Sequence, residues 1–325
     1  MTSRILVTGG AGFIGSAYVR ALLGSSGPPG VTVTVLDKLT YAGSLTRLDP
    51  VRGHPRLAFV HGDVCDAVTV RRLAARHDEI VNFAAESHVD RSIEDGSAFT
   101  RTNVLGTQLL LDAALRHGVR TFVQISTDEV YGSLPEGAAR EEDQLRPSSP
   151  YAASKAAADL IALAHHRTHG LDVRVTRCSN NFGPFQHPEK VVPRFVGALL
   201  TGADLPVYGD GRQVRDWLHV DDHVRAVELV RTAGRPGETY NIGGGTSLTN
   251  LDLAHRLIGL CGADPARITH VTDRKGHDRR YAVDHGKISA ELGYRPGVDF
   301  QEALAATVDW YRRHRSWWEP LLAAV

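Results

Sequence analysis

The side chains best suited to chemistry lie in two short runs, residues 126–132 and 151–155. Hydride transfer alone needs a cofactor and one group that moves the hydroxyl proton. Tyr151 and Lys155 can supply that group, so the carboxyl groups of Asp128 and Glu129 are left for proton transfers at other carbons. This combination predicts oxidation coupled to elimination of water.

Tyr151 and Lys155 are four residues apart, which puts them on one face of a helix. Ser149 and Pro150 favour an N-cap and a first helical position, so a helix is predicted to begin there and to reach residue 169. A free tyrosine has a pKa of about 10, and both a neighbouring ammonium and a positive nicotinamide ring would lower it. Without a cofactor motif, the same spacing would suit an ordinary surface pair.

Asp128 and Glu129 follow a predicted strand over residues 121–125. Neighbours on a regular strand point to opposite faces, so both carboxyl groups reach one substrate only if the chain turns there. The polar run 126–129 permits such a turn. The alternative is a pair of solvated loop carboxylates.

The elements that would position these groups alternate between strand and helix. Strands are expected over 4–8, 31–36, 57–61, 79–83, 121–125 and 173–177, and helices over 15–23, 67–76, 100–117 and 151–169. This alternation predicts the α/β class, with a Rossmann-type doubly wound parallel sheet that binds ligands at the carboxyl ends of its strands. Prolines and glycines divide the chain beyond residue 180 into short elements. We therefore expect a cofactor-binding domain over 1–180 and a smaller substrate-binding portion over 181–325, interleaved through strands or turns near 214–245.

Three glycines, Gly9, Gly12 and Gly15, follow the first strand and open the first helix. Such a loop lets a pyrophosphate approach a helix N-terminus, although a tight turn also uses glycine. Asp37 ends the second strand 22 residues after Gly15, where a carboxylate can bind ribose hydroxyls and repel a 2′-phosphate. The pattern predicts NAD rather than NADP, although Asp37 could instead cap a turn and Lys38 weakens the preference.

Two further strand ends have suitable residues for the same ligand. Asp63 ends the third strand and could meet the adenine, with a turn aspartate as the alternative. Phe83, Ala84 and Ala85 follow the fourth strand, where small residues let a dinucleotide lie against the backbone.

The composition indicates a soluble globular protein, with 42% hydrophobic residues and a formal net charge of zero. No general attraction to nucleic acid or to an anionic membrane is therefore expected. Cys65, Cys178 and Cys261 are widely spaced without a Cys-x-x-Cys pair, which argues against a disulfide framework and against a metal site. Because no signal region or long apolar stretch occurs, a cytoplasmic location is expected.

Beyond these local features, the chain closely resembles the dTDP-glucose 4,6-dehydratases of the extended short-chain dehydrogenase/reductase superfamily. The resembling segments are 8–16, 36–43, 84–93, 126–132, 148–155, 176–184, 206–211, 215–218 and 276–281. The glycine loop and Tyr-x-x-x-Lys mark only the superfamily, whereas Thr-Asp-Glu at 127–129 marks the dehydratases. The resemblance implies a hydro-lyase that uses NAD to convert dTDP-glucose into dTDP-4-keto-6-deoxyglucose by C4 oxidation, loss of water across C5 and C6, and hydride return to C6.

The resemblance also implies a role for each reactive side chain. Tyr151, with Lys155 beside it, takes the proton of the C4 hydroxyl, and Thr127 hydrogen-bonds the oxygen that becomes a ketone. Glu129 then removes the C5 proton, and Asp128 protonates the departing C6 hydroxyl. Asp128 must therefore be protonated while Glu129 is ionised, so their surroundings must separate the two pKa values.

Two sets of binding residues follow from the same resemblance. The predicted NAD site comprises Gly9, Gly12, Phe13, Ile14, Gly15, Asp37, Lys38, Leu39, Thr40, Asp63, Val64, Phe83, Ala84, Ala85, Ser87, Thr102, Tyr151, Lys155 and Asn181. The predicted nucleotide-sugar site comprises Ser87, His88, Thr127, Asn180, Lys190, Val191, Pro206, Val207, Tyr208, Arg215, Asn250 and His277. Arg215 is the predicted diphosphate ligand, because a guanidinium offers paired donors to phosphate oxygens. The alternative for Arg215 is a surface pair with Asp216 or Asp222.

Family members are generally homodimers through the helices that correspond to 100–117 and 151–169. Leu105, Leu109 and Ala113 form one stripe on the first of these, which would equally suit the monomer's own core. The chain departs from the family pattern at Lys275, where proline is usual, and in the segment 133–147, which is shorter than in some relatives.

Alternative functions remain on the same scaffold. These are a UDP-sugar 4,6-dehydratase, a nucleotide-sugar 4-epimerase that stops after oxidation and re-reduction at C4, and a catalytically silent NAD-binding regulatory protein. The four residues Asp128, Glu129, Tyr151 and Lys155 argue against the silent protein, since a structural role would not require all of them.

Overall fold

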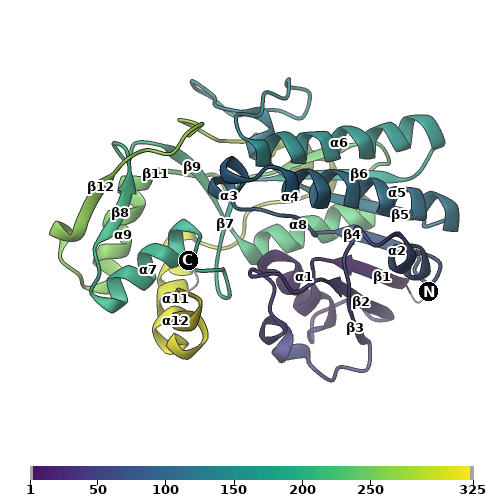
Figure 1. Ribbon diagram of the computed structural model, residues 1–325, viewed down its shortest axis with the longest axis horizontal. Coiled ribbons are helices and arrows are strands. Elements are labelled where there is room, and N and C mark those ends of the chain that lie inside the picture. The colour runs from purple at the N-terminus through teal and green to yellow at the C-terminus, as the bar shows by residue number, and fades with distance from the viewer. Residues whose placement is uncertain (1–2, 323–325) are drawn as a thin grey trace.

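The computed structural model describes residues 3–322. Its centre is a parallel sheet of seven strands in the order β10-β6-β5-β4-β1-β2-β3 (Figure 1). The strands are β1 (Ser3–Thr8), β2 (Val31–Asp37), β3 (Leu57–His61), β4 (Glu79–Asn82), β5 (Thr121–Thr127), β6 (Val173–Cys178) and β10 (Thr239–Ile242). The strand order reverses between β1 and β4, which is the crevice where such sheets bind ligands. The predicted α/β class with a doubly wound parallel sheet is confirmed.

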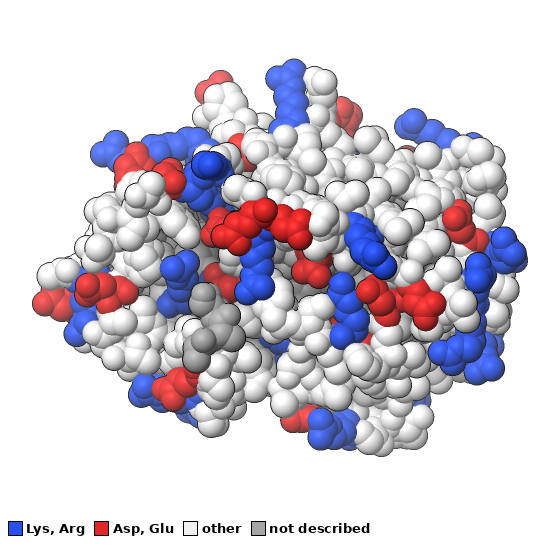
Figure 2. Space-filling view, viewed as in Figure 1, with Lys and Arg blue, Asp and Glu red and all other residues white. Residues whose placement is uncertain are grey.

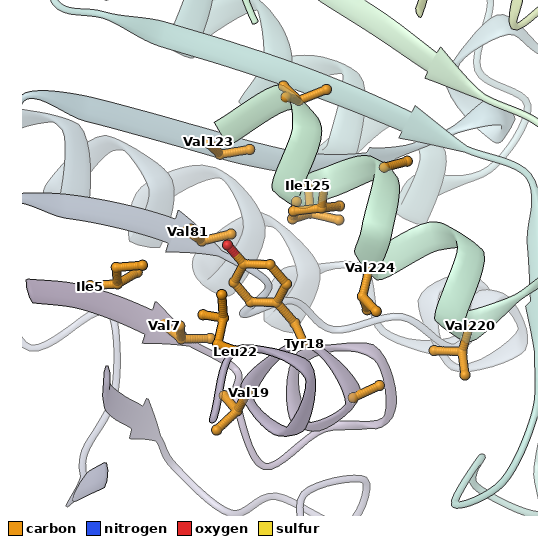
Figure 3. Close-up of a cluster of buried hydrophobic side chains, with 14 of the residues drawn as sticks. Ile5, Val7, Tyr18, Val19, Leu22, Val81, Val123, Ile125, Val220 and Val224 are labelled. Atoms are coloured by element: carbon orange, nitrogen blue, oxygen red, sulfur yellow. The ribbon is translucent and has the colours of Figure 1, made fainter. Parts of the chain in front are cut away.

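Helices cover both faces of this sheet. One face carries α1 (Phe13–Leu23), α8 (Val220–Ala233) and α10 (Gly286–Leu292), and the other carries α2 (Ala67–Ala74), α5 (Gly106–His117) and α6 (Pro150–His169). Figure 3 shows Tyr18 and Leu22 of α1 packed between sheet valines and Val224 of α8. The sheet is thus buried on both faces, as its continuous apolar strands require.

A second part of the molecule surrounds two small sheets. The three-stranded sheet holds β7 (Asn180–Phe182), β9 (Val214–His219) and β11 (Thr246–Thr249), and the two-stranded sheet pairs β8 (Leu205–Tyr208) with β12 (Ile268–Val271). Around them pack α7 (Val191–Thr201), α9 (Asn250–Cys261), α11 (Phe300–Arg313) and α12 (Arg315–Leu322). Of the segment 214–245, α8 and β10 lie with the large sheet, whereas β9 lies in the three-stranded sheet.

Short elements complete the described chain. They are the helical turns η1 (Leu45–Val51), α3 (Val89–Glu94), α4 (Ser97–Phe99), the π-helical η2 (Thr100–Leu105), η3 (Asp128–Tyr131) and η4 (Pro265–Arg267). Residues 220–222, expected as strand or turn, instead begin α8. The reason is a helix start: the His219 side chain accepts a hydrogen bond from the Asp221 N–H, and Asp221 and Asp222 lie in the first turn.

Acidic and basic side chains are interspersed over the face shown in Figure 2, in keeping with the zero net charge. Within residues 3–322, no helix is both long enough and apolar enough to cross a lipid bilayer.

Candidate active site

A hollow, here called the sheet-edge cleft, opens at the carboxyl ends of β1 and β4. Gly9 has a φ of +68°, and a Cβ on it would lie 2.6 Å from the backbone nitrogen of Ala84. A Cβ on Gly15 would lie 2.3 Å from the carbonyl oxygen of Gly9. Only glycine therefore allows this close passage of the loop. The loop ends at α1, whose N-terminus has no side-chain cap and no acidic residue in its first turn, which leaves it suited to an anion.

Asp37, at the end of β2, has its carboxylate fixed by two backbone bonds. One oxygen accepts a hydrogen bond from the Ala11 N–H (2.9 Å) and the other from the Leu39 N–H (2.8 Å). Each oxygen keeps a free lone pair, which suits ribose hydroxyls. The uncapped helix and this carboxylate fit the diphosphate and a ribose of a dinucleotide.

Most of the predicted NAD residues line the sheet-edge cleft. They are Gly9, Gly12, Phe13, Ile14, Gly15, Asp37, Lys38, Thr40, Val64, Phe83, Ala84, Ala85, Ser87, Thr102, Tyr151, Lys155 and Asn181. Leu39 and Asp63 lie outside the lining. Asp63 accepts a hydrogen bond from the Cys65 N–H (2.9 Å), as an aspartate in a turn does, and its carboxylate lies 3.8 Å from the Lys38 Nζ.

The turn that the two carboxyl groups require is present after β5. Strand β5 runs two residues further than expected, and η3 begins at Asp128. The Thr127 hydroxyl bonds to both carboxyl residues: it accepts a hydrogen bond from the Glu129 N–H (3.3 Å) and donates one to the Asp128 Oδ1 (3.2 Å). Asp128 is only 3% exposed, so the pair does not belong to a solvated loop.

The surroundings of the two carboxyl groups differ in charge. Burial raises the pKa of Asp128 well above its usual range, and the neighbouring Glu129 raises it further. Burial also raises the pKa of Glu129, but Arg274, Arg215 and Lys190 oppose that rise. Arg215 also opposes the rise at Asp128, but Arg274 and Lys190 act in addition at Glu129, so Glu129 is the carboxyl group that ionises more readily.

Tyr151 and Lys155 project from the first turns of α6. This helix begins at Pro150, and the Ser149 hydroxyl accepts from the Ala152 N–H (3.1 Å) as predicted. Burial raises the pKa of Tyr151 well above its usual range, and the Glu129 carboxylate adds to the rise. The Lys155 ammonium donates to the Ile125 carbonyl oxygen. The lowering of the Tyr151 pKa that the spacing predicts is thus outweighed by burial.

A second hollow, here called the side pocket, adjoins the cleft. Every predicted nucleotide-sugar residue except Thr127 lines it: Ser87, His88, Asn180, Lys190, Val191, Pro206, Val207, Tyr208, Arg215, Asn250 and His277. Thr127 lines the sheet-edge cleft instead. The pocket therefore brings together segments that are far apart in the sequence.

Arg215 is 5% exposed and does not form the surface pair considered as its alternative. It donates to the carbonyl oxygens of Val214 (2.7 Å) and Asp278 (3.0 Å), and its guanidinium lies 4.3 Å from the centre of the Tyr281 ring. Asp222 pairs with Arg225 instead (2.7 Å). The charge of Arg215 is therefore directed to the pocket rather than to solvent.

Six residues line both hollows: Ser87, Glu129, Asn180, Glu189, Lys190 and Val191. A ligand that extends from the side pocket into the cleft would pass them. Glu129 is the only one of the two adjacent carboxyl residues that reaches both hollows, whereas Asp128 lines the cleft alone.

Sequence reasoning missed several polar lining residues. Arg274 lies 3.7 Å from the Asp90 carboxylate, and Asp90 accepts a hydrogen bond from the Tyr208 hydroxyl (3.3 Å). Arg194 lines the same pocket. Usable signals were present. Arg194 is four residues after Lys190, one helical turn further along. Asp90 falls in the resembling segment 84–93, and Arg274 lies two residues before the segment 276–281.

Comparison with known proteins agrees with this geometry. The model of the GDP-mannose 4,6 dehydratase family matches residues 6–307. A dTDP-glucose 4,6-dehydratase of Streptomyces griseus is 63% identical over 100% of this chain and 98% of its own. The chain belongs to the dTDP-glucose 4,6-dehydratase family. The dTDP-glucose 4,6-dehydratase of Streptomyces venezuelae, crystallised with NAD, superposes with a TM-score of 0.96 at 58% identity, covering 98% of this chain and 99% of that one.

More distant members of the fold differ in chemistry. A UDP-glucose 4-epimerase of Thermotoga maritima superposes on this dehydratase-family chain with a TM-score of 0.88 at 32% identity, covering 95% and 99% of the two chains. The scaffold is thus shared, and the reaction must be argued from the side chains in the site.

Proposed function

We propose that the protein is an NAD-dependent dTDP-glucose 4,6-dehydratase that produces dTDP-4-keto-6-deoxyglucose. One observation carries the reaction type: two adjacent carboxyl groups are held by a turn at the end of β5 in the cleft that Tyr151 also lines, and Arg274, Arg215 and Lys190 face Glu129. An epimerase needs no such pair, because it only oxidises and reduces C4. The dehydratase reading also agrees with relatives of 57–63% identity over nearly the full chain.

NAD supplies the oxidation at C4 and the reduction at C6 when it is bound. The uncapped N-terminus of α1 would hold its diphosphate, and Asp37 a ribose. Ala84 and Ala85 leave room along the end of β4.

Tyr151 takes the proton of the C4 hydroxyl, and the Thr127 hydroxyl hydrogen-bonds the same oxygen. Both side chains line the sheet-edge cleft with Lys155. Lys155 is fixed by its bond to the Ile125 carbonyl oxygen. Tyr151 must be a tyrosinate to take this proton, and the Lys155 ammonium, with the positive ring of NAD when it is bound, would favour that form.

Once C4 is a ketone, the C5 hydrogen is acidic and Glu129 removes it. Asp128 delivers its proton to the C6 hydroxyl, which leaves as water. Glu129 then returns its proton to C5. The proton that Tyr151 took from the C4 hydroxyl replaces the one that Asp128 lost, so the site returns to its starting state and the net change is loss of one water.

The side pocket binds the nucleoside diphosphate. Arg215, Arg274 and Lys190 offer charge to the diphosphate, and Pro206, Val207 and Tyr208 form the wall for the base. Glu129 then lies between nucleotide and cleft, where the hexose must pass.

Incubation of the purified protein with dTDP-glucose and, separately, with UDP-glucose tests the proposal. We expect the alkali-induced absorbance of a 4-keto product to develop with dTDP-glucose. Conversion of UDP-glucose to its C4 epimer without that absorbance would refute the dehydratase. A preference for UDP-glucose with 4-keto product would refute only the choice of nucleotide, since thymine and uracil differ by one methyl group worth about 1–3 kcal/mol.

A homodimer completes the proposal. Of the predicted stripe, Ala113 is buried in the core but Leu105 is 46% exposed, and Leu160 on the adjacent helix α6 is 59% exposed. Exposed leucines at the end of η2 and on α6 suit a helix-on-helix interface. Light scattering should give the mass of two chains, and the mass of one chain at micromolar concentration would contradict the dimer.

A further inference from the structure

Two guanidinium groups, one buried and one half-buried, lie next to each other near the glycine loop. Arg47, in η1, is 1% exposed and donates only to backbone carbonyl oxygens, those of Ala11 (3.3 Å), Ala42 (2.6 Å) and Phe185 (2.9 Å). Its Nη2 is buried without a hydrogen-bond partner. Arg20 lies next to it and donates to the Arg47 carbonyl oxygen (2.7 Å). Within residues 3–322, neither guanidinium forms an ion pair with a carboxylate.

An unpaired buried cation is expensive, and two neighbouring ones repel each other. Burial lowers the pKa of both Arg20 and Arg47 to about 10, so both stay charged at neutral pH. A group that binds beside them and carries negative charge would relieve this cost.

Arg47 is placed to meet such a group, whereas Arg20 is not. Arg47 lines the sheet-edge cleft together with Gly12 and Gly43, but Arg20 is absent from the lining. The carbonyl of Ala11 that Arg47 holds directly precedes Gly12, the N-cap of the 11-residue helix α1. The guanidinium and the positive end of the helix therefore converge on one stretch of the cleft.

We propose that Arg47 binds the diphosphate of the dinucleotide, as a second source of positive charge beside the N-terminus of α1. The inference rests on the proposed use of NAD. Arg47 also reaches the second part of the molecule, through the Phe185 carbonyl and the Trp317 ring, whose centre lies 5.2 Å from its guanidinium carbon. Bound dinucleotide is thereby tied to the packing of α12 as well as to the large sheet.

Calorimetric titration of the NAD-stripped full chain with NAD, ADP and adenosine tests this contact. The substitution Arg47→Met should lower the affinities for NAD and for ADP by about 10- to 100-fold, which is the range for a hydrogen bond to a charged group. Adenosine has no phosphate, so its affinity should stay at the wild-type value. The matched control is Arg20→Met, which removes the neighbouring half-buried guanidinium outside the cleft and should leave all three affinities unchanged.

Equal weakening of adenosine and NAD would overturn the proposal, because it would mean that Arg47 only shapes the loop. An unchanged NAD affinity would also overturn the proposal, because it would mean that the Arg47 Nη2 bonds to a buried water rather than to the diphosphate. If Arg47→Met does not fold, Arg47→Lys is measured by the same criteria, since a lysine keeps the charge but loses the fixed fork. Failure of the wild-type chain to bind NAD or ADP would instead refute the proposed function.

Discussion

The sheet-edge cleft and the side pocket both meet an anionic ligand, but they are built differently. The cleft combines a glycine loop and the uncapped N-terminus of α1 with charged side chains of both signs, among them Asp37, Lys38 and Arg47. The side pocket has the long side chains of Arg194, Arg215 and Arg274, which do not line the cleft, and it shares Lys190 with the cleft. Substitutions in the side pocket should therefore change substrate handling and leave NAD binding intact, with Glu129 at the boundary between the two.

The largest effect is expected at the carboxyl pair. Asp128→Asn and Glu129→Gln should each slow formation of the 4-keto product by about 100- to 10,000-fold, because each removes a proton-transfer group. Bound NAD, measured by absorbance after release from the purified protein, should match the wild type. Normal product formation by either variant would end the assignment of acid and base.

A smaller effect is expected from the charge in the side pocket. Arg215→Met should weaken dTDP binding by about 10- to 100-fold, since it removes a donor to a charged ligand. Titration with dTDP measures this, and titration with NAD serves as the control. Equal losses of affinity for dTDP and for NAD would show that the cleft and the side pocket do not bind their ligands independently.

The pH dependence of stability tests the surroundings of Asp128. Its folded-state pKa is raised above the unfolded value, so the native state keeps a proton that the unfolded chain releases. Its contribution to stability therefore falls as pH rises from about 4 towards the folded pKa, by about 1.4 kcal/mol per pH unit. Asp128→Asn lacks this titration.

The variant should therefore gain stability relative to the wild type as pH rises. Urea unfolding of both proteins at about pH 4.5, 6 and 7.5 measures this gain. Asp210→Asn is the control, because hydrogen bonding lowers the pKa of that exposed carboxyl. A difference between Asp128→Asn and wild type that does not vary with pH would contradict a buried, neutral Asp128.

The smallest effect is expected at the edge of the side pocket. Tyr208→Phe removes the hydrogen bond to Asp90 (3.3 Å) but keeps the ring beside the base. We expect dTDP affinity to fall by no more than about 1 kcal/mol. A loss as large as that of Arg215→Met would assign a direct ligand contact to the Tyr208 hydroxyl.

Prediction from sequence succeeded where local rules decide. Ser149 and Pro150 specify the start of α6, and apolar runs specify the strands of the large sheet. The turn expected within the polar run 126–129 is present at Asp128, but the strand before it was predicted two residues too short, because Ser126 and Thr127 are polar and yet continue β5. The start of α8 was misjudged because its cap is a histidine, which is not a typical capping residue.

The residues that sequence reasoning missed depend on distant partners. Arg47 is held by the carbonyl oxygens of Ala11 and Phe185, which lie 36 and 138 residues away in the chain. No side-chain pattern reports a bond to a backbone carbonyl at that separation. The charge it presents to the cleft becomes visible only when the parts are assembled.

The position of β10 has a consequence for synthesis of the chain. This strand pairs with β6 at one edge of the large sheet, yet 60 residues separate Cys178 from Thr239, and α8, which covers one face, is made only shortly before it. A ribosome must therefore deliver β7, α7, β8 and β9 of the second part before β10 can complete the large sheet. Nascent chains halted near residue 215 should expose the apolar face normally hidden by α8 and should depend on chaperones until translation resumes.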